Sequence, residues 1–155
     1  MAGRIDARLK ELGITLPQAA TPVANYVPYV ITGNLVFISG QGPMGPKGVE
    51  YAGKLGRDFD VDQGKAAARL TALNVVAQLK NAVGGDLDRV KRVVKLLGFV
   101  NSTPDFNQQP FVINGASDIM VEIFGDAGRH ARSAVSAPSL PVDIAVEVEA
   151  IFEIE

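Results

Sequence analysis

The sequence predicts an α+β domain in which two helices cover one face of a mixed β-sheet. Three observations support this fold class. Residues 144–155 alternate between apolar and mostly charged side chains, as in a strand with one buried face. Residues 62–83 and 108–124 carry apolar side chains at helical spacing. Residues 26–41 hold two β-rich runs around a Thr-Gly-Asn turn signal, which is typical of a hairpin.

A short amphipathic helix is expected over residues 4–12, ahead of the sheet. Its apolar face is made by Ile5, Leu9 and Leu12. A proline-containing connector follows this helix. We therefore expect residues 1–25 to form an N-terminal helix and connector, and residues 26–155 to form a single domain.

The hairpin contains a proline and a strand that is apolar on both sides. Pro28 cannot donate a ladder hydrogen bond, so the first strand should lie at an edge or a bulge. Leu35 and Phe37 point to one side of the second strand, and Val36 and Ile38 point to the other. Because exposing apolar surface costs about 25 cal/mol per Å², we expect an oligomer that buries the face left uncovered by the helices.

The remaining elements follow from composition and spacing. Residues 42–60 are dense in Gly and Pro and predict a surface loop. The helix over 62–83 precedes a β-branched strand over 90–100, and the second helix spans 108–124. The apolar face of that second helix is expected to include Phe111, Ile119, Val121 and Phe124. The predicted order is helix, strand, strand, helix, strand, helix, strand.

Composition limits the possible classes of function. The 155 residues contain no cysteine, which excludes disulfides, thiolate metal sites and cysteine nucleophiles. A single histidine argues against a transition-metal site. The net charge of −2 argues against nucleic acid as an obligatory partner. We find no secretory signal and no run that could span a bilayer, so a cytoplasmic protein without membrane contact is expected.

Arg132 is the first candidate for a binding residue. It follows a Gly-rich corner and stands where a short apolar strand begins. A guanidinium fixed at a strand start can hold a substrate carboxylate through two hydrogen bonds. The alternative is a surface arginine that pairs with a neighbouring carboxylate. His130 has no serine or aspartate at a recognisable spacing, so the sequence indicates no hydrolase triad.

Glu147 and Glu149 share one side of the predicted last strand. One interpretation is a solvated outer face. If that face is instead buried between subunits, a carboxylate there needs a partner or a chemical role. The glycines between residues 40 and 56 match no nucleotide-binding motif. The residues by themselves thus predict an oligomeric α+β domain. They are compatible with an acid-binding cleft but do not decide whether one is present.

Three segments resemble the RidA/YjgF family, also called the endoribonuclease L-PSP family. They are GNLVFISGQ at 33–41, NVVAQLKNAVGG at 74–85, and the ARSAV, LP and VEVEAI motifs within 131–151. The resemblance runs from about residue 26 to the C-terminus. It implies a chorismate-mutase-like fold and a homotrimer, with a central barrel of sheets, outer helices and clefts between subunits. It also implies hydrolysis of reactive imines and enamines to 2-oxo acids and ammonia, with no cofactor and no metal.

The resemblance also implies roles for individual residues. Arg132 matches the family's carboxylate-binding arginine, and Glu147 matches the strand glutamate that orients or activates water. The implied substrate-binding positions are Tyr26, Ser39, Asn114, Arg132 and Ala134. Tyr26 stands in Ala-Asn-Tyr where the family has Gly-Pro-Tyr. Ala134 replaces a family cysteine, so any role of that thiol is lost.

The resemblance therefore predicts an imine deaminase in which Arg132 holds the carboxylate of a 2-imino acid and Glu147 directs water. Two other functions stay open. One is a non-catalytic trimer that binds small acids or other metabolites. The other is a ribonuclease or translation inhibitor, against which the acidic charge balance argues.

Overall fold

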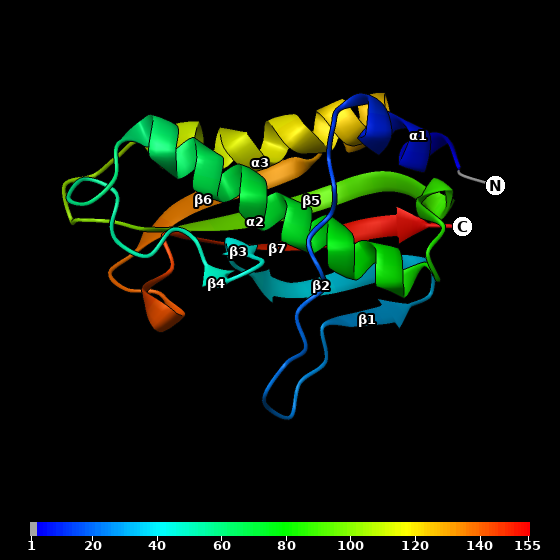
Figure 1. Ribbon diagram of the computed structural model, residues 1–155, viewed down its shortest axis with the longest axis horizontal. Coiled ribbons are helices and arrows are strands. Elements are labelled where there is room, and N and C mark those ends of the chain that lie inside the picture. The colour runs from blue at the N-terminus through cyan, green and yellow to red at the C-terminus, as the bar shows by residue number, and fades with distance from the viewer. Residues whose placement is uncertain (1–2) are drawn as a thin grey trace.

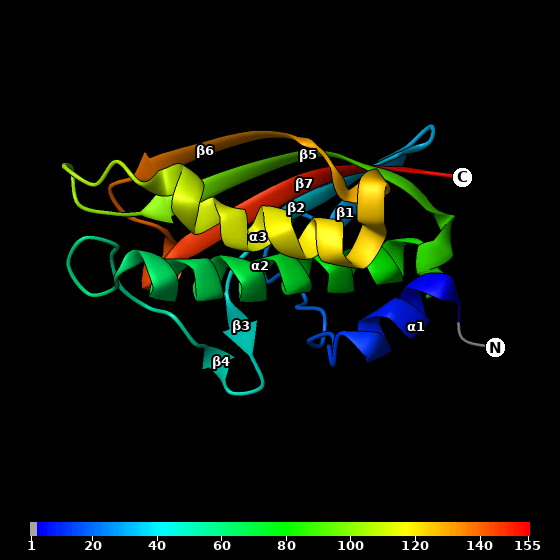
Figure 2. The same ribbon diagram turned by 90° about the horizontal axis from the view of Figure 1, so that it is seen from above.

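The computed structural model describes residues 3–155 as a layer of helices packed on one face of a sheet (Figures 1 and 2). Residues 1 and 2 of the predicted N-terminal region lie outside this description. Over the described residues, five strands form one mixed sheet in the order β1-β2-β7-β5-β6. Their bounds are β1 Tyr29–Thr32, β2 Leu35–Gln41, β5 Val90–Asn101, β6 Ala131–Ala137 and β7 Val146–Ile154. The predicted α+β class is confirmed.

Two long helices, α2 (Val61–Ala82) and α3 (Gln109–Phe124), cover the same face of the sheet, as predicted. Figure 2 shows them side by side beneath the strands. The two helices approach closely at Gly115, where a Cβ atom would lie only 2.1 Å from the backbone oxygen of Lys65. Any side chain at this position would push the helices apart.

Capping and a glycine fix the two ends of α2. Asp60 accepts a hydrogen bond from the backbone N–H of Gln63, and the Gln63 side chain accepts one from the backbone N–H of Asp60. This reciprocal pair is a capping box. Beyond the C-terminus, Gly84 has φ +67°, a left-handed conformation that glycine adopts without strain. These local signals explain why the predicted range of 62–83 agrees with the helix to within one residue.

The predicted order of elements omits β6 as a separate strand, although a short apolar strand was expected to begin at Arg132. β6 runs parallel to β5, while the other neighbouring strands of the sheet are antiparallel. The predicted loop at 42–60 also contains a small hairpin of β3 (Met44–Gly45) and β4 (Gly48–Val49). β1 lies at a sheet edge, as Pro28 indicated.

The apolar face of α3 differs from the expected one at its start. Phe111 is 57% exposed, so the expectation that it begins the buried face is wrong. The buried face begins at Val112 and continues through Ile113, Ala116, Ile119, Met120, Ile123 and Phe124. Phe111 shares the first turn with Val112, which is fully buried, so its exposure follows from its position on the opposite side of the helix from the buried residues.

The N-terminal helix α1 (Arg4–Glu11) packs beside the other helices. Ile5 and Leu9 are buried, as its amphipathic pattern predicts. The Asp88 carboxylate accepts hydrogen bonds from the backbone N–H groups of Ile5 (2.8 Å) and Arg4 (2.9 Å). These bonds lower the pKa of Asp88. A carboxylate distant in sequence thus accepts hydrogen bonds from N–H groups of the first turn that have no partner within the helix.

The sheet has one covered and one open face, and we use the term open face for the side opposite α2 and α3. The predicted alternation in β7 is confirmed, because its even-numbered residues are buried beneath the helices. On the open face, Val30, Phe37 and Val135 are 51%, 40% and 44% exposed. Among the described residues, no helix combines the length and apolar character needed to cross a bilayer.

Candidate functional site

Arg132 lies on β6, on the side of the sheet that α3 covers. Its Nη1 donates hydrogen bonds to Asn114 Oδ1 (2.8 Å) and to Ser117 Oγ (3.2 Å). Asn114 and Ser117 lie one helical turn apart on α3, so their side chains share one face of that helix. Ala134 follows on the same side of β6, opposite Gly98. The structure therefore brings together three of the predicted residues: Asn114, Arg132 and Ala134.

His130 extends this group of side chains. Its Nε2 lies 2.8 Å from Ser117 Oγ, and its Nδ1 lies 2.6 Å from the backbone oxygen of Gly128. No sequence spacing indicated a serine partner for His130, but the packing of α3 against β6 brings Ser117 to it. We call Asn114, Ser117, His130 and Arg132 the arginine cluster.

Ser117 is the residue of this cluster that sequence reasoning missed. The available signal was its spacing from Asn114, since residues three apart lie on the same face of a helix. A shallow pocket of 290 Å³ is lined by three members of the cluster, Ser117, His130 and Arg132. The other residues lining this pocket are Asp118, Val121 and Arg129. An arginine held by neutral acceptors beside open space is suited to bind an anion.

Glu147 lies on β7 and points to the open face. It is opposite Phe99 of β5, and its carboxylate lies over Gly40 of β2. A Cβ atom at Gly40 would be 2.2 Å from Glu147 Oε2, so the glycine of the Ser-Gly-Gln motif leaves room for this carboxylate. Burial raises the pKa of Glu147, and the negative charge of Glu149 raises it further.

Ser39 and Tyr26 lie toward the other edge of the sheet. Ser39 Oγ donates a hydrogen bond of 2.7 Å to the backbone oxygen of Val27, and the Ser39 N–H donates to the backbone oxygen of Pro28. Tyr26, the residue before Val27, is 55% exposed. Ser39 is also adjacent to Gly40, which lies under Glu147. We call Tyr26, Ser39 and Glu147 the glutamate cluster.

The two clusters do not share a pocket within one chain. Arg132 lies on an edge strand and points toward α3, whereas Glu147 lies on the central strand and points to the open face. Ser39 and Tyr26 are nearer the opposite edge, at β2 and before β1. Within one copy of the chain, the predicted site residues are thus divided into two groups on different strands, and none of Tyr26, Ser39 and Glu147 lines the pocket beside Arg132.

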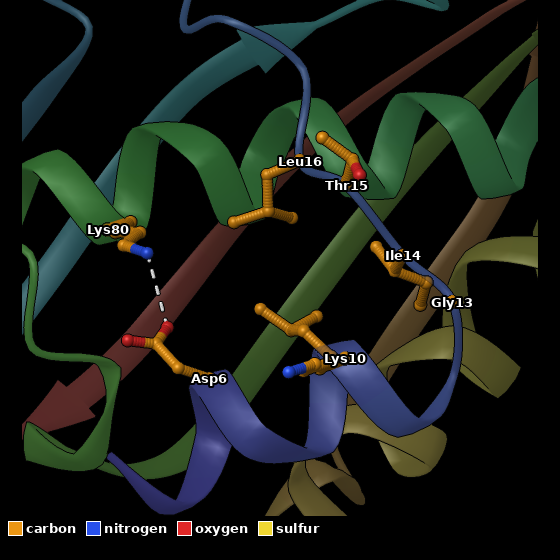
Figure 3. Close-up of a pocket in the computed structure, with 8 residues that line it drawn as sticks. Asp6, Lys10, Gly13, Ile14, Thr15, Leu16 and Lys80 are labelled. Atoms are coloured by element: carbon orange, nitrogen blue, oxygen red, sulfur yellow. Dashed lines mark hydrogen bonds and ion pairs between the residues drawn. The ribbon is translucent and has the colours of Figure 1, made fainter. Parts of the chain in front are cut away.

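A larger hollow of 530 Å³ lies between α1, the connector after it and α2 (Figure 3). Asp6 and Lys80 face each other across it and form an ion pair of 3.2 Å. None of the predicted site residues lines this hollow. Across residues 3–155, no group of three or more His, Cys, Asp or Glu side chains is placed to hold a metal ion.

The fold and the arginine cluster together define an α+β protein in which an arginine, held by neutral side chains, lies beside an open pocket. The chain belongs to the family described as "YjgF/chorismate_mutase-like, putative endoribonuclease", whose model matches residues 6–154. The family resemblance seen in the sequence is therefore confirmed.

Individual relatives agree with this membership. The chain is 52% identical to Protein TCP17 of Trypanosoma cruzi over 99% of this chain and 96% of that protein. The crystal structure of Atu1372 from Agrobacterium tumefaciens, a protein of unknown function, has a TM-score of 0.91 at 51% identity and covers 97% of this chain and 92% of its own. A structure of E. coli TdcF with bound serine has a TM-score of 0.62 at 28% identity and covers 89% and 94%.

Proposed function

We propose that this protein hydrolyses 2-imino acids, or their enamine tautomers, to 2-oxo acids and ammonia in clefts between copies of the chain. The division of the predicted residues into an arginine cluster and a glutamate cluster carries this proposal. Each cluster supplies half of the required chemistry. One offers a fixed cation for a carboxylate, and the other offers a half-buried carboxylate for proton transfer.

The open face supports an assembly that joins the two halves. Its exposed apolar side chains, including Phe37 and Val135, favour burial against another protein surface. The proposed assembly is a homotrimer in which the β6 edge of one copy packs on the open face of the next. This arrangement brings the arginine cluster of one copy to the glutamate cluster of its neighbour. A cytoplasmic location of the protein fits a substrate that metabolism produces.

The chemistry needs no group beyond the side chains and water. Arg132 holds the substrate carboxylate, while Glu147 accepts a proton from the water that attacks the imine carbon. The new C–O bond gives a carbinolamine, and proton transfer to its nitrogen lets ammonia leave as the C=O bond forms. A raised pKa makes the Glu147 carboxylate a stronger proton acceptor than an ordinary glutamate, which suits a group that accepts a proton from water.

The relative with bound serine supports a ligand of this kind. TdcF was solved with an amino acid, which carries a carboxylate next to a nitrogen-bearing carbon. A 2-imino acid has the same two groups on adjacent carbons. We therefore assign this chain a small ligand with a carboxylate, held by Arg132, Asn114 and Ser39, with Tyr26 and the backbone at Ala134 lining the cleft.

The test measures 2-oxo acid formation when the protein is added to a dehydratase reaction that releases 2-aminoacrylate. Arg132→Ala should lower kcat/KM by about 100-fold, because it removes a charge-assisted carboxylate contact. Glu147→Gln should mainly lower kcat, because it removes the proton acceptor. Glu122→Ala, at an exposed position of α3, is the control for alanine substitution.

Equal 2-oxo acid formation by wild type, Arg132→Ala and Glu147→Gln would overturn the proposal. Binding of 2-oxobutyrate without turnover of any imine tested would instead identify a metabolite-binding protein. RNA cleavage that is lost in Arg132→Ala would favour the endoribonuclease activity named in the family description.

A further inference from the structure

The hydrogen bonds around His130 have a defined direction. A backbone carbonyl oxygen only accepts, so the contact with Gly128 requires the proton of a neutral imidazole to be on Nδ1. Nε2 is then an acceptor, and the Ser117 hydroxyl donates its proton to it. The lone pairs of Ser117 Oγ are left to accept from Arg132 Nη1. The chain of bonds thus runs from Arg132 through Ser117 and His130 to Gly128.

These hydrogen bonds occupy one nitrogen of the Arg132 guanidinium and leave the opposite edge available to bind a ligand. Arg132 Nη1 carries two hydrogens, and its two acceptors are Asn114 Oδ1 and Ser117 Oγ. Within residues 3–155, Nε and Nη2 of Arg132 donate to no protein acceptor. These two nitrogens form one edge of the planar guanidinium, and such an edge binds a carboxylate through two parallel hydrogen bonds.

We propose that Ser117 and His130 are positioning residues that turn the Nε–Nη2 edge of Arg132 toward the ligand carboxylate. The proposal rests on the proposed function, because the ligand is the small acid assigned there. His130 acts through Ser117. By accepting the hydroxyl proton, it prevents Ser117 from donating to Asn114 Oδ1, the second acceptor that holds Nη1.

The tautomer of His130 is an independent test of the direction of this chain of hydrogen bonds. The protein has one histidine, so an imidazole ¹⁵N spectrum has one set of signals and needs no assignment. We expect the Nδ1–H tautomer in the neutral wild-type protein, although the Nε2–H form is the more common one for free imidazole side chains. A wild-type spectrum dominated by Nε2–H would overturn the proposal.

Binding of 2-oxobutyrate, followed by calorimetry, tests the effect on Arg132. Ser117→Ala and His130→Ala should each raise the Kd about tenfold, which is the loss expected for weakening a hydrogen bond to a charged group. Ser117→Thr keeps the hydroxyl and should restore binding to within about twofold. In the imine assay, Ser117→Ala should raise KM more than it lowers kcat. Unchanged Kd and KM in Ser117→Ala would overturn the proposal, with Glu122→Ala as the matched control on α3.

A further measurement separates this proposal from the proposed function. If wild type neither binds 2-oxobutyrate nor hydrolyses imines, the proposed function fails. Rotation of the Arg132 guanidinium, measured from its side-chain ¹⁵N signals, then decides the positioning role alone. Rotation should be slow in wild type and faster in Ser117→Ala and His130→Ala, and equal rates would overturn the role of Ser117 and His130.

Discussion

The two faces of the sheet are built from the same strands but serve different purposes. On the covered face, Val36 and Phe152 are fully buried beneath the helices. On the open face, Phe37, which follows Val36 in the sequence, is 40% exposed, and Glu147 occupies a half-buried position. One chain therefore completes its own core, whereas the open face has no covering layer from the described residues. The proposed site is divided in the same way, with Arg132 on the covered side and Glu147 on the open side.

The largest expected effect comes from comparing adjacent residues of β7 that point to opposite faces. Phe152→Ala should lower the free energy of unfolding by about 3–5 kcal/mol, because it leaves a cavity in the core next to Phe124. Ile151→Ala, on the open face, should cost about 1 kcal/mol. Urea denaturation at a protein concentration too low for association measures both. Equal losses would show that the open face is as tightly packed as the core.

A charge on the open face should disrupt the assembly while leaving the core intact. Phe37→Asp places a carboxylate among apolar side chains of the proposed interface, and it should weaken association by about 2 kcal/mol or more. Light scattering coupled to gel filtration should then report a smaller species than the wild type, and imine hydrolysis should fall with it.

Phe111→Asp is the matched control for this experiment. Phe111 is also an exposed phenylalanine, but it lies on α3 in the helical layer. The variant should keep the wild-type mass and activity. A Phe37→Asp protein that has the wild-type mass, or a Phe111→Asp protein that dissociates equally, would contradict the assignment of the interface to the open face.

The smallest expected effect concerns the pH dependence of activity. Glu147 must be ionised to accept a proton, so kcat/KM should rise with pH through a pKa above the ordinary glutamate value. Glu149→Gln removes the nearby negative charge, which lowers the pKa of Glu147 and moves this rise to lower pH. The shift is partial, because burial, the larger cause, is unchanged. Glu153→Gln, further along β7, should leave the profile unchanged, and a profile unaffected by Glu149→Gln would contradict the coupling.

Local patterns were sufficient to predict α2, the β1–β2 hairpin and β7. In each case the burial period and the turn or capping residues lie within a short stretch, as Asp60, Gln63 and Gly84 show for α2. The strand expected at Arg132 was not separated from the last strand in the predicted order, because the residues of β6 alternate only weakly. Its strand conformation depends on parallel pairing with β5, some 36 residues earlier in the chain.

The sequence by itself determined the α+β class and an uncovered apolar sheet face, and through family resemblance it singled out Arg132 and Glu147 as candidate site residues. Only the tertiary structure decided that these two side chains lie on opposite sides of the sheet and that Ser117 links His130 to Arg132. Strand register determines which side of the sheet each of these two side chains faces. The packing of α3 on β6 determines the hydrogen bonds that join His130, Ser117 and Arg132. Both are contacts between distant segments, which no local pattern records.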